Sequence, residues 1–268
     1  QRSVTLALAV QQTSQLAGML MGLAASLVGV PLLFAWQSLV MLIGGIATRQ
    51  LPKKQSNDGI IHAPRAQAMK DGLAYVRRSD VIFPVVIAMF AVGVFYIGSF
   101  VVILPLIVRD FYGGGLVEIG IANIAFWGAT IISTVALLRV GHVARRGRGA
   151  ILALAVGVLV VGAFSFEMPF WLFSVFSFIW GLGAGCVMIL SRTIVQSETD
   201  EAFRARALSI FQLGFAGGAP LGSLTMGVLA GLVGSHMAMW FPTIGMTLVL
   251  AWLMLKSRLW TLHAHDAT

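Results

Sequence analysis

Apolar residues form eight long runs along the chain, separated by shorter polar segments. A helix needs about 20 apolar residues to cross roughly 30 Å of hydrocarbon, and most of the runs supply them. The strands of a membrane β-barrel would instead alternate apolar and polar residues, which these runs do not do. The pattern therefore predicts an all-α integral membrane protein with eight transmembrane helices. The runs are Val4–Val28, Val30–Thr48, Val81–Val108, Leu116–Leu138, Ala150–Phe166, Phe170–Leu190, Ala207–Val233 and Met237–Leu255.

The positive residues between these runs are distributed unevenly. If Arg2 is assigned to one side of the membrane, every other Lys and Arg except Arg109 falls on that same side. Arg109 is accompanied on the other side by Asp110, Glu118 and Glu167. Because Lys and Arg near the ends of spans stay in the cytoplasm, the asymmetry predicts eight crossings with both ends of the chain cytoplasmic.

The composition agrees with a protein embedded in lipid. Hydrophobic residues make up 58% of the chain and charged residues 10%, whereas about 25% charged is usual in soluble domains. The net charge of +8 comes from the Lys and Arg residues on the one side of the membrane, where they favour contact with anionic lipid headgroups. The positive charge is thereby explained without nucleic acid, and no nucleic-acid partner is expected. The single cysteine, Cys186, excludes an intrachain disulfide.

A nine-residue segment of the first run recurs in the seventh. Residues Met21–Gly29 and Met226–Gly234 are identical at six of nine positions, and both segments travel outward from the cytoplasm. A parallel duplication of a six-helix unit would give this spacing. Chance similarity is the alternative, because membrane segments draw on few residue types. A six-helix unit would make residues 1–48 the last two helices of a first bundle and residues 81–258 a complete second bundle.

The longest polar gap, residues 49–80, lies where two such bundles would join. It begins with Pro, Lys, Asn and Gly residues typical of a flexible linker. Residues 65–78 then follow a helical pattern in which Ala66, Met69, Leu73 and Val76 share one face. This pattern predicts a cytoplasmic linker with an amphipathic helix on the membrane surface, and residues 259–268 form a cytoplasmic tail.

Four segments resemble elements of the major facilitator superfamily, in particular its enterobactin-exporter-like and macrolide-efflux-like branch. With helices numbered as in the family, they match the start of the second half, the end of the seventh helix, the entry to the eleventh helix and the interior of that helix. In chain order the segments are Met69–Asp80, Leu104–Asp110, Arg204–Ser209 and Ala219–Gly222.

The resemblance implies a secondary active transporter of the bacterial inner membrane that works by alternating access and needs no cofactor. It implies export of a hydrophobic or amphiphilic small molecule, such as a drug or siderophore, by a protein that is monomeric when full length. Four further helices are expected before the present chain. The loop Gly141–Arg148 lacks the acidic residue usual in the family, and Gly18–Gly22 lacks a Gly-Pro pair. Coupling to a proton gradient is therefore assigned to residues outside this chain.

No ionisable residue lies at mid-membrane depth, so the candidate cavity residues are neutral polar or aromatic ones. Such residues can line a cavity for a bulky, partly apolar solute, or they can simply hold helices together. The candidates are Gln11, Gln15, Tyr96, Asn123, Trp127, Trp180 and Gln212. No metal site is predicted.

Two further groups are candidates for conformational roles. Small residues and a proline can serve tight helix packing or a flexing gate, and these are Gly181, Gly185, Gly218, Pro220 and Gly222. Charged residues on the cytoplasmic side can form a gate of ion pairs or an ordinary solvated surface, and these are Arg145, Arg146, Glu198, Arg204 and Arg206.

Transport by a small-molecule exporter is the leading interpretation. An uptake permease of the same superfamily and a truncated, inactive product are the alternatives. A membrane enzyme is disfavoured, because the sequence lacks the clustered nucleophiles, acids or metal ligands that such chemistry requires.

Overall fold

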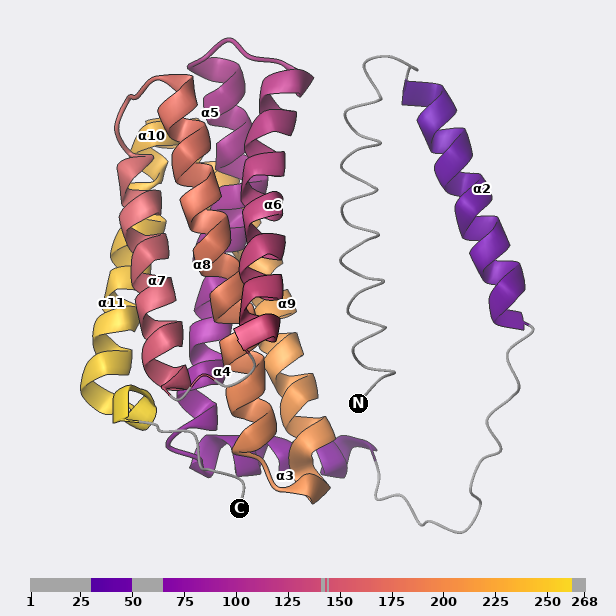
Figure 1. The fold of residues 1–268 in the computed structure, drawn as a ribbon, viewed down its shortest axis with the longest axis vertical. Helices are drawn as coiled ribbons and strands as arrows, with labels where there is room; N and C mark the ends of the chain where they lie inside the picture. The colour runs from indigo at the N-terminus through magenta and orange to yellow at the C-terminus, as the bar shows by residue number, and fades with distance from the viewer. Residues whose placement is uncertain (1–29, 50–64, 141–142, 144, 262–268) are drawn as a thin grey trace. The chain divides into compact units, whose positions relative to one another are not determined.

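The computed structural model describes residues 30–49, 65–140, 143 and 145–261 of the chain (Figure 1). The chain divides into two compact units, residues 1–65 and residues 66–268. The first predicted helix, Val4–Val28, lies outside the described residues. The second corresponds to α2, Val30–Arg49, which contains the apolar stretch Phe34–Ile46.

The second unit is helical throughout its described part, and no strand occurs there. Six helical segments are long and apolar enough to cross a membrane, which confirms the predicted all-α membrane fold. The first of them, Ile82–Asp110, combines four elements, and the last, Ser235–Lys256, combines two. In order, the elements are α3 Arg65–Arg78, α4 Ile82–Ala91, η1 Val92–Ile97, η2 Ser99–Ile103, α5 Leu104–Asp110, α6 Leu116–Val140, α7 Arg146–Ala163, α8 Phe170–Ser197, α9 Glu201–Val233, α10 Ser235–Ala238, α11 Trp240–Lys256 and η3 Arg258–Thr261.

The helices of the second unit pack around a continuous apolar core. Helix α8 contacts both α6 and α7, whereas α9 packs against the first span and α11 packs against α7 (Figure 1). The largest fully buried side chains include Trp180, Phe164, Phe173 and Phe211. Because lipid tails are as apolar as these side chains, close van der Waals packing rather than the hydrophobic effect holds the spans together.

Glycines allow the backbones of α9 and the first span to touch. A Cβ atom on Gly218 would collide with the carbonyl oxygen of Phe90, and one on Gly222 would collide with that of Val94. Gly93 and Gly98 face α9 in the same way from the first span. The absence of a side chain at these four positions therefore sets the distance between the two helices.

The first span is not a regular α-helix in its middle. Elements η1 and η2 are π-helical, a rare conformation that is used mostly in short pieces and often near functional sites. The Ser99 hydroxyl donates to the carbonyl oxygen of Phe95 at 2.6 Å within this stretch. The Tyr96 hydroxyl donates to the carbonyl oxygen of Leu154 on α7 at 3.0 Å, which ties the π-helical stretch to its neighbour.

Nearly all of the described positive charge of the second unit lies at one end of the spans, which we call the basic end. It carries Lys70, Arg77, Arg78, Arg139, Arg145, Arg146, Arg148, Arg192, Arg204, Arg206, Lys256 and Arg258. The opposite end carries Arg109, Asp110, Glu118 and Glu167. The helices thus alternate in direction as the charge pattern predicts, and α3 lies across the basic end (Figure 1).

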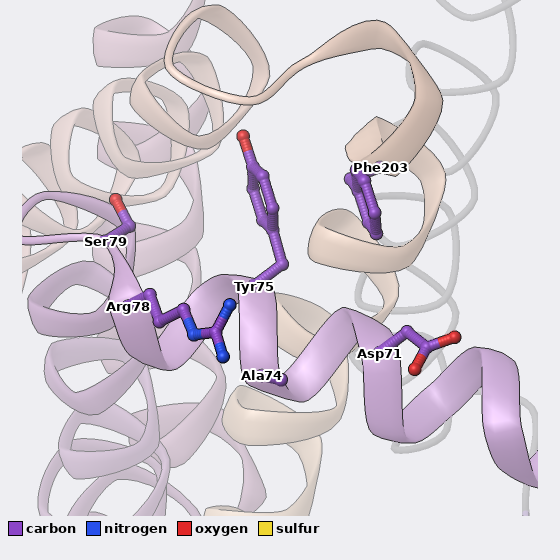
Figure 2. A pocket seen from close by; sticks show the side chains of 6 residues that line it. All are labelled: Asp71, Ala74, Tyr75, Arg78, Ser79 and Phe203. Atoms are coloured by element: carbon purple, nitrogen blue, oxygen red, sulfur yellow. The ribbon is translucent and has the colours of Figure 1, made fainter.

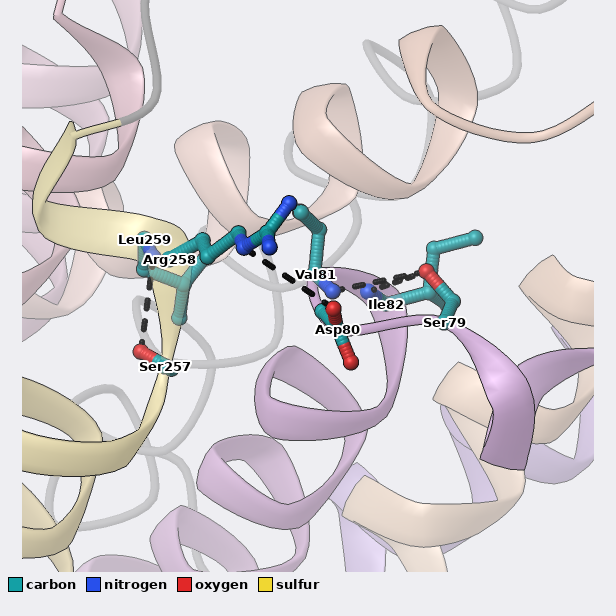
Figure 3. A network of polar contacts seen from close by, with 7 residues as sticks. All are labelled: Ser79, Asp80, Val81, Ile82, Ser257, Arg258 and Leu259. Atoms are coloured by element: carbon teal, nitrogen blue, oxygen red, sulfur yellow. Dashed lines mark hydrogen bonds and ion pairs between the residues drawn. The ribbon is translucent and has the colours of Figure 1, made fainter.

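Residues 257–261, which we call the C-terminal strap, connect three elements at the basic end. Arg258 Nε lies 3.8 Å from Asp80 Oδ2, just before α4, and both side chains are exposed (Figure 3). The backbone of Leu259 lies so close to Gly147 that a Cβ there would collide with it. Arg148 Nε donates to the carbonyl oxygen of Trp260 at 2.8 Å, and the guanidinium lies 5.3 Å from the ring centroid. The start of α7 is therefore fastened to the end of the last span.

Candidate substrate cavity and gates

Three helices bring five aromatic side chains together, and we call this group the aromatic cluster. Phe100 lies at its centre, with ring centroids 4.3 Å from Phe126, 5.9 Å from Trp180 and 6.0 Å from Trp127. Tyr96 meets Trp180 edge to face at 5.7 Å. Offset or edge-to-face contacts of this kind stabilise a pair by about 0.5–1.5 kcal/mol beyond the area they bury. The members come from the first span, α6 and α8.

The predicted cavity residues differ in how the structure places them. Trp180 is 2% exposed and Tyr96 is 7% exposed, so both belong to the interior of the second unit. Trp127 and Asn123 are half-buried, and Gln212 is exposed on α9, outside the aromatic cluster. Gln11 and Gln15 lie outside the described residues. The structure thus brings Tyr96, Trp127 and Trp180 together.

Phe100 and Phe126 are members of the cluster that the sequence pattern did not single out. Phe100 follows Tyr96 by four residues, and Phe126 directly precedes Trp127. Phenylalanine is so common in apolar spans that its presence alone carries little information. The spacing of four residues from Tyr96 was the available signal for Phe100, whereas Phe126, directly before Trp127, offered none.

Asn123 and Trp127 form the polar border of the cluster on α6. Asn123 Nδ2 donates to the carbonyl oxygen of Ile119 at 2.9 Å, which leaves the amide oxygen as an acceptor. Trp127 follows by one helical turn, and its indole N–H has no hydrogen bond within the described part of the chain. A solute resting on this border would meet an aromatic face, the indole N–H and the second amide N–H as donors, and the amide oxygen as an acceptor.

The predicted packing and gating residues lie mostly at close helix contacts. A Cβ on Gly181 would collide with the backbone of Phe126, and one on Gly185 would meet the Ser133 hydroxyl and the carbonyl oxygen of Thr130. Thr130 Oγ1 donates to the carbonyl oxygen of Gly181 at 3.0 Å across the same interface. Gly218 and Gly222 contact the first span as described above, whereas Pro220 is exposed.

The predicted gate charges form no ion pair with one another in the described residues. Arg145 and Glu198 are exposed, while Arg146, Arg204 and Arg206 are half-buried. The Arg206 guanidinium lies 5.3 Å from the ring centroid of Phe203 instead. The gate therefore stays a prediction, and Asp80–Arg258 is an ion pair that the described residues do form at this end.

A cavity of about 630 Å³ opens between α3 and the start of α9 (Figure 2). The rings of Tyr75 and Phe203 stack at 4.6 Å beside it. The Tyr75 hydroxyl donates to Asp200 Oδ2 at 3.1 Å and lies 3.1 Å from the Asp200 backbone N–H. The lining residues are Asp71, Ala74, Tyr75, Arg78, Ser79 and Phe203.

At the opposite end of the spans, Tyr112 and His236 contact the backbone of neighbouring segments. The Tyr112 hydroxyl donates to the carbonyl oxygen of Met168 at 2.7 Å, and burial raises the pKa of Tyr112 to about 12. His236 Nδ1 lies 2.9 Å from the carbonyl oxygen of Phe164, and its ring meets Phe111 edge to face. Tyr112 therefore remains a neutral hydrogen-bond donor throughout the physiological pH range.

Solved structures of a transporter share this fold. Two crystal structures of a mutant of the peptide transporter POT, one with alafosfalin and one with sulfate, align with TM-scores of 0.58 and 0.56. Sequence identity is 18% and 19%, and the alignments cover 77% and 73% of this chain. The chain spans less than half of those transporters, 46% and 42% of their lengths. No curated protein matches the chain significantly.

The sequence itself matches a family profile over almost its whole length. Residues 2–268 fit the profile of the transmembrane secretion effectors, a group within the major facilitator superfamily. The match includes both compact units, and the six spans of the second unit agree with it. The chain therefore belongs to the transmembrane secretion effector family of the major facilitator superfamily.

Proposed function

We propose that this membrane transporter exports a bulky, partly apolar small molecule, drug- or siderophore-like, by alternating access. The single observation that carries the proposal is the aromatic cluster with its border of Asn123 and Trp127, set in spans that are uncharged between their ends. Aromatic faces with a few convergent polar groups suit an amphiphilic solute better than a highly hydroxylated one.

Tyr96, Trp127, Trp180 and Asn123 are proposed to line the cavity in the second unit. Gln11 and Gln15 stay proposed as further cavity residues. Gln212, exposed on α9, is proposed to meet the solute. The proposed orientation puts the basic end and both chain ends in the cytoplasm of a bacterium, because the basic end carries twelve of the thirteen described Lys and Arg residues from Lys70 to Arg258.

Movement of helices within the second unit would rely on its close helix contacts. Gly181, Gly185, Gly218 and Gly222 would let backbones slide past one another, and Pro220 lacks the N–H that would resist a bend in α9. Arg145, Arg146, Glu198, Arg204 and Arg206 are proposed to pair with charges of the other bundle when the cytoplasmic side closes. Coupling to a proton gradient, in a monomeric full-length protein, is assigned to residues outside the present chain.

Replacing Trp127 with alanine in the intact protein is expected to weaken transport of an aromatic amphiphilic dye several-fold. Loss of one ring contact costs about 0.5–1.5 kcal/mol, which corresponds to roughly a 2- to 12-fold rise in the half-saturating dye concentration. Trp127→Phe should keep most of the affinity, because it keeps a ring. The measurement is dye efflux from cells with and without an uncoupler.

Trp171→Ala is the matched control, because Trp171 is 66% exposed and lies outside the aromatic cluster. Equal efflux from the Trp127→Ala and Trp171→Ala variants would show that Trp127 does not contact the dye. Energy-dependent accumulation of dye in the cells, instead of efflux, would show that the protein is an uptake permease and not an exporter. The absence of energised movement across a broad panel of dyes would contradict the proposed function as a whole.

A further inference from the structure

Helix α3 has two faces with different surroundings. Gly72 and Val76 lie on its inner face, where a Cβ on Gly72 would lie 3.1 Å from Arg206 Cβ and Val76 is 1% exposed. Met69 and Leu73, four residues apart on the adjoining edge, are 60% and 54% exposed. The sequence pattern assigned Met69, Leu73 and Val76 to one face, but the structure buries Val76 and leaves Met69 and Leu73 exposed.

The inner face is fixed to α9 by specific contacts. Tyr75 stacks on Phe203 and bonds to Asp200, as Figure 2 shows for the two rings. Because these contacts come from the first turn of α9 and the residue before it, α3 cannot rotate without breaking them. The exposed edge therefore has a defined direction relative to the spans.

The exposed edge adjoins a row of positive charge. Lys70 and Arg77, seven residues apart, share one side of the helix, and Arg78 follows them. All three side chains are exposed, and Asp71 is the acidic residue of α3. Apolar side chains flanked by basic ones are the pattern of a helix that lies in the interface of a membrane rather than in water.

The position of α3 is also restricted by the chain. It ends at Arg78 and the first membrane span begins at Ile82, so three residues connect them. Figure 1 shows α3 lying across the ends of the spans, not continuing any of them. The helix is therefore held at the level where the spans leave the hydrocarbon.

We propose that α3 is a binding site for the anionic headgroups of phospholipids in the leaflet at the basic end. Met69 and Leu73 enter the acyl boundary, while Lys70, Arg77 and Arg78 bind the phosphates. Because Tyr75 on the inner face contacts Phe203 and Asp200 at the start of α9, anionic lipid bound to α3 also stabilises the position of that end of α9. This inference is independent of what the protein transports.

The test places a fluorescent reporter on the exposed edge. The chain carrying Cys186→Ser and Leu73→Cys is labelled with an environment-sensitive dye and reconstituted into phosphatidylcholine vesicles containing brominated phosphatidylglycerol. Quenching should exceed that by brominated phosphatidylcholine at the same mole fraction. The preference should weaken at high salt, because the Debye length falls from about 10 Å at 0.1 M to about 3 Å at 1 M.

Charge variants separate a headgroup site from a general basic surface. Lys70→Gln, Arg77→Gln and Arg78→Gln together should lower the preference for the anionic lipid at least about fivefold, since each basic residue near such a surface contributes about 1 kcal/mol. The charge-keeping set Lys70→Arg, Arg77→Lys and Arg78→Lys should retain it. The matched control, Arg139→Gln, Arg145→Gln and Arg146→Gln, removes equal charge from the same end away from α3 and should also retain it.

Three results would overturn the proposal. Equal quenching by both brominated lipids would make α3 an unselective interfacial helix. Quenching by aqueous iodide alone would make it a solvated connector. Protection from all quenchers would mean that another protein segment covers the edge.

Discussion

Gly218→Ala is expected to destabilise the bundle, whereas Gly217→Ala, one residue earlier on the same helix, is expected to leave it intact. A Cβ on Gly218 would overlap the carbonyl oxygen of Phe90 and crowd the backbone at Gly93. Nothing lies within 4 Å of the corresponding position on Gly217. Because backbone on both sides must move, overpacking at Gly218 should cost about 1–3 kcal/mol or more. At Gly217 the better helix propensity of alanine should contribute up to about 1 kcal/mol.

The comparison is made on purified protein in nanodiscs. The midpoint of thermal unfolding and the monodisperse fraction should fall for Gly218→Ala and hold or rise for Gly217→Ala. Gly222→Ala repeats the collision one turn further on, because Gly222 meets the backbone of Val94, and Gly227→Ala, five residues later in open space, is its control. Equal midpoints within each pair would mean that α9 does not touch the first span as described.

Trp180→Ala should cause the largest loss of stability among single changes in the aromatic cluster. Trp180 is 2% exposed and its ring meets those of Tyr96, Phe100 and Phe126 within 6 Å. Truncating a buried tryptophan costs about 3–5 kcal/mol, because the removed contacts leave a cavity that the helices fill incompletely. The free energy of unfolding should be measured by denaturation of the reconstituted protein.

Trp171→Ala is the control on the same helix. Its side chain is 66% exposed, so its loss should change the free energy of unfolding by less than about 1 kcal/mol. If Trp180→Ala instead unfolds like wild type but no longer moves the dye, Trp180 would contact the solute rather than hold the core. The two readouts therefore distinguish the packing role from the cavity role.

Hydropathy predicted the spans well but not the ends of the helices. The sixth predicted run was expected to end at Leu190, and the corresponding helix α8 continues to Ser197. Helix α9 begins at Glu201, six residues before the predicted start at Ala207. The length of an apolar run reflects the thickness of the membrane's hydrocarbon core. Backbone hydrogen bonding continues the helix beyond that core into the polar region, so the helices are longer than the runs. The π-helical stretch of the first span, which packs against α9, has no counterpart in the composition.

The site was less predictable than the spans because lipid and protein interior are equally apolar. A soluble helix reveals its buried face by its polar one, but α6 and α7 are apolar on every side. The pattern could therefore find Tyr96 and Trp180 without predicting that both are buried within one unit. In α3, where polar residues are frequent, it found the helix but not the division between Val76 and Leu73.

The separation of charge to the two ends also determines how the spans respond to an electric field. The apolar middles of the six described spans, residues 82–108, 119–138, 149–163, 170–191, 207–233 and 235–255, contain no Asp, Glu, Lys or Arg. Moving one elementary charge through the membrane potential involves about 2.3 kcal/mol per 100 mV. When these helices tilt, they carry essentially no gating charge, so voltage does no work on them. A charged cargo or coupling ion would feel the full potential, and the described spans themselves would move equally well in a polarised or a depolarised cell.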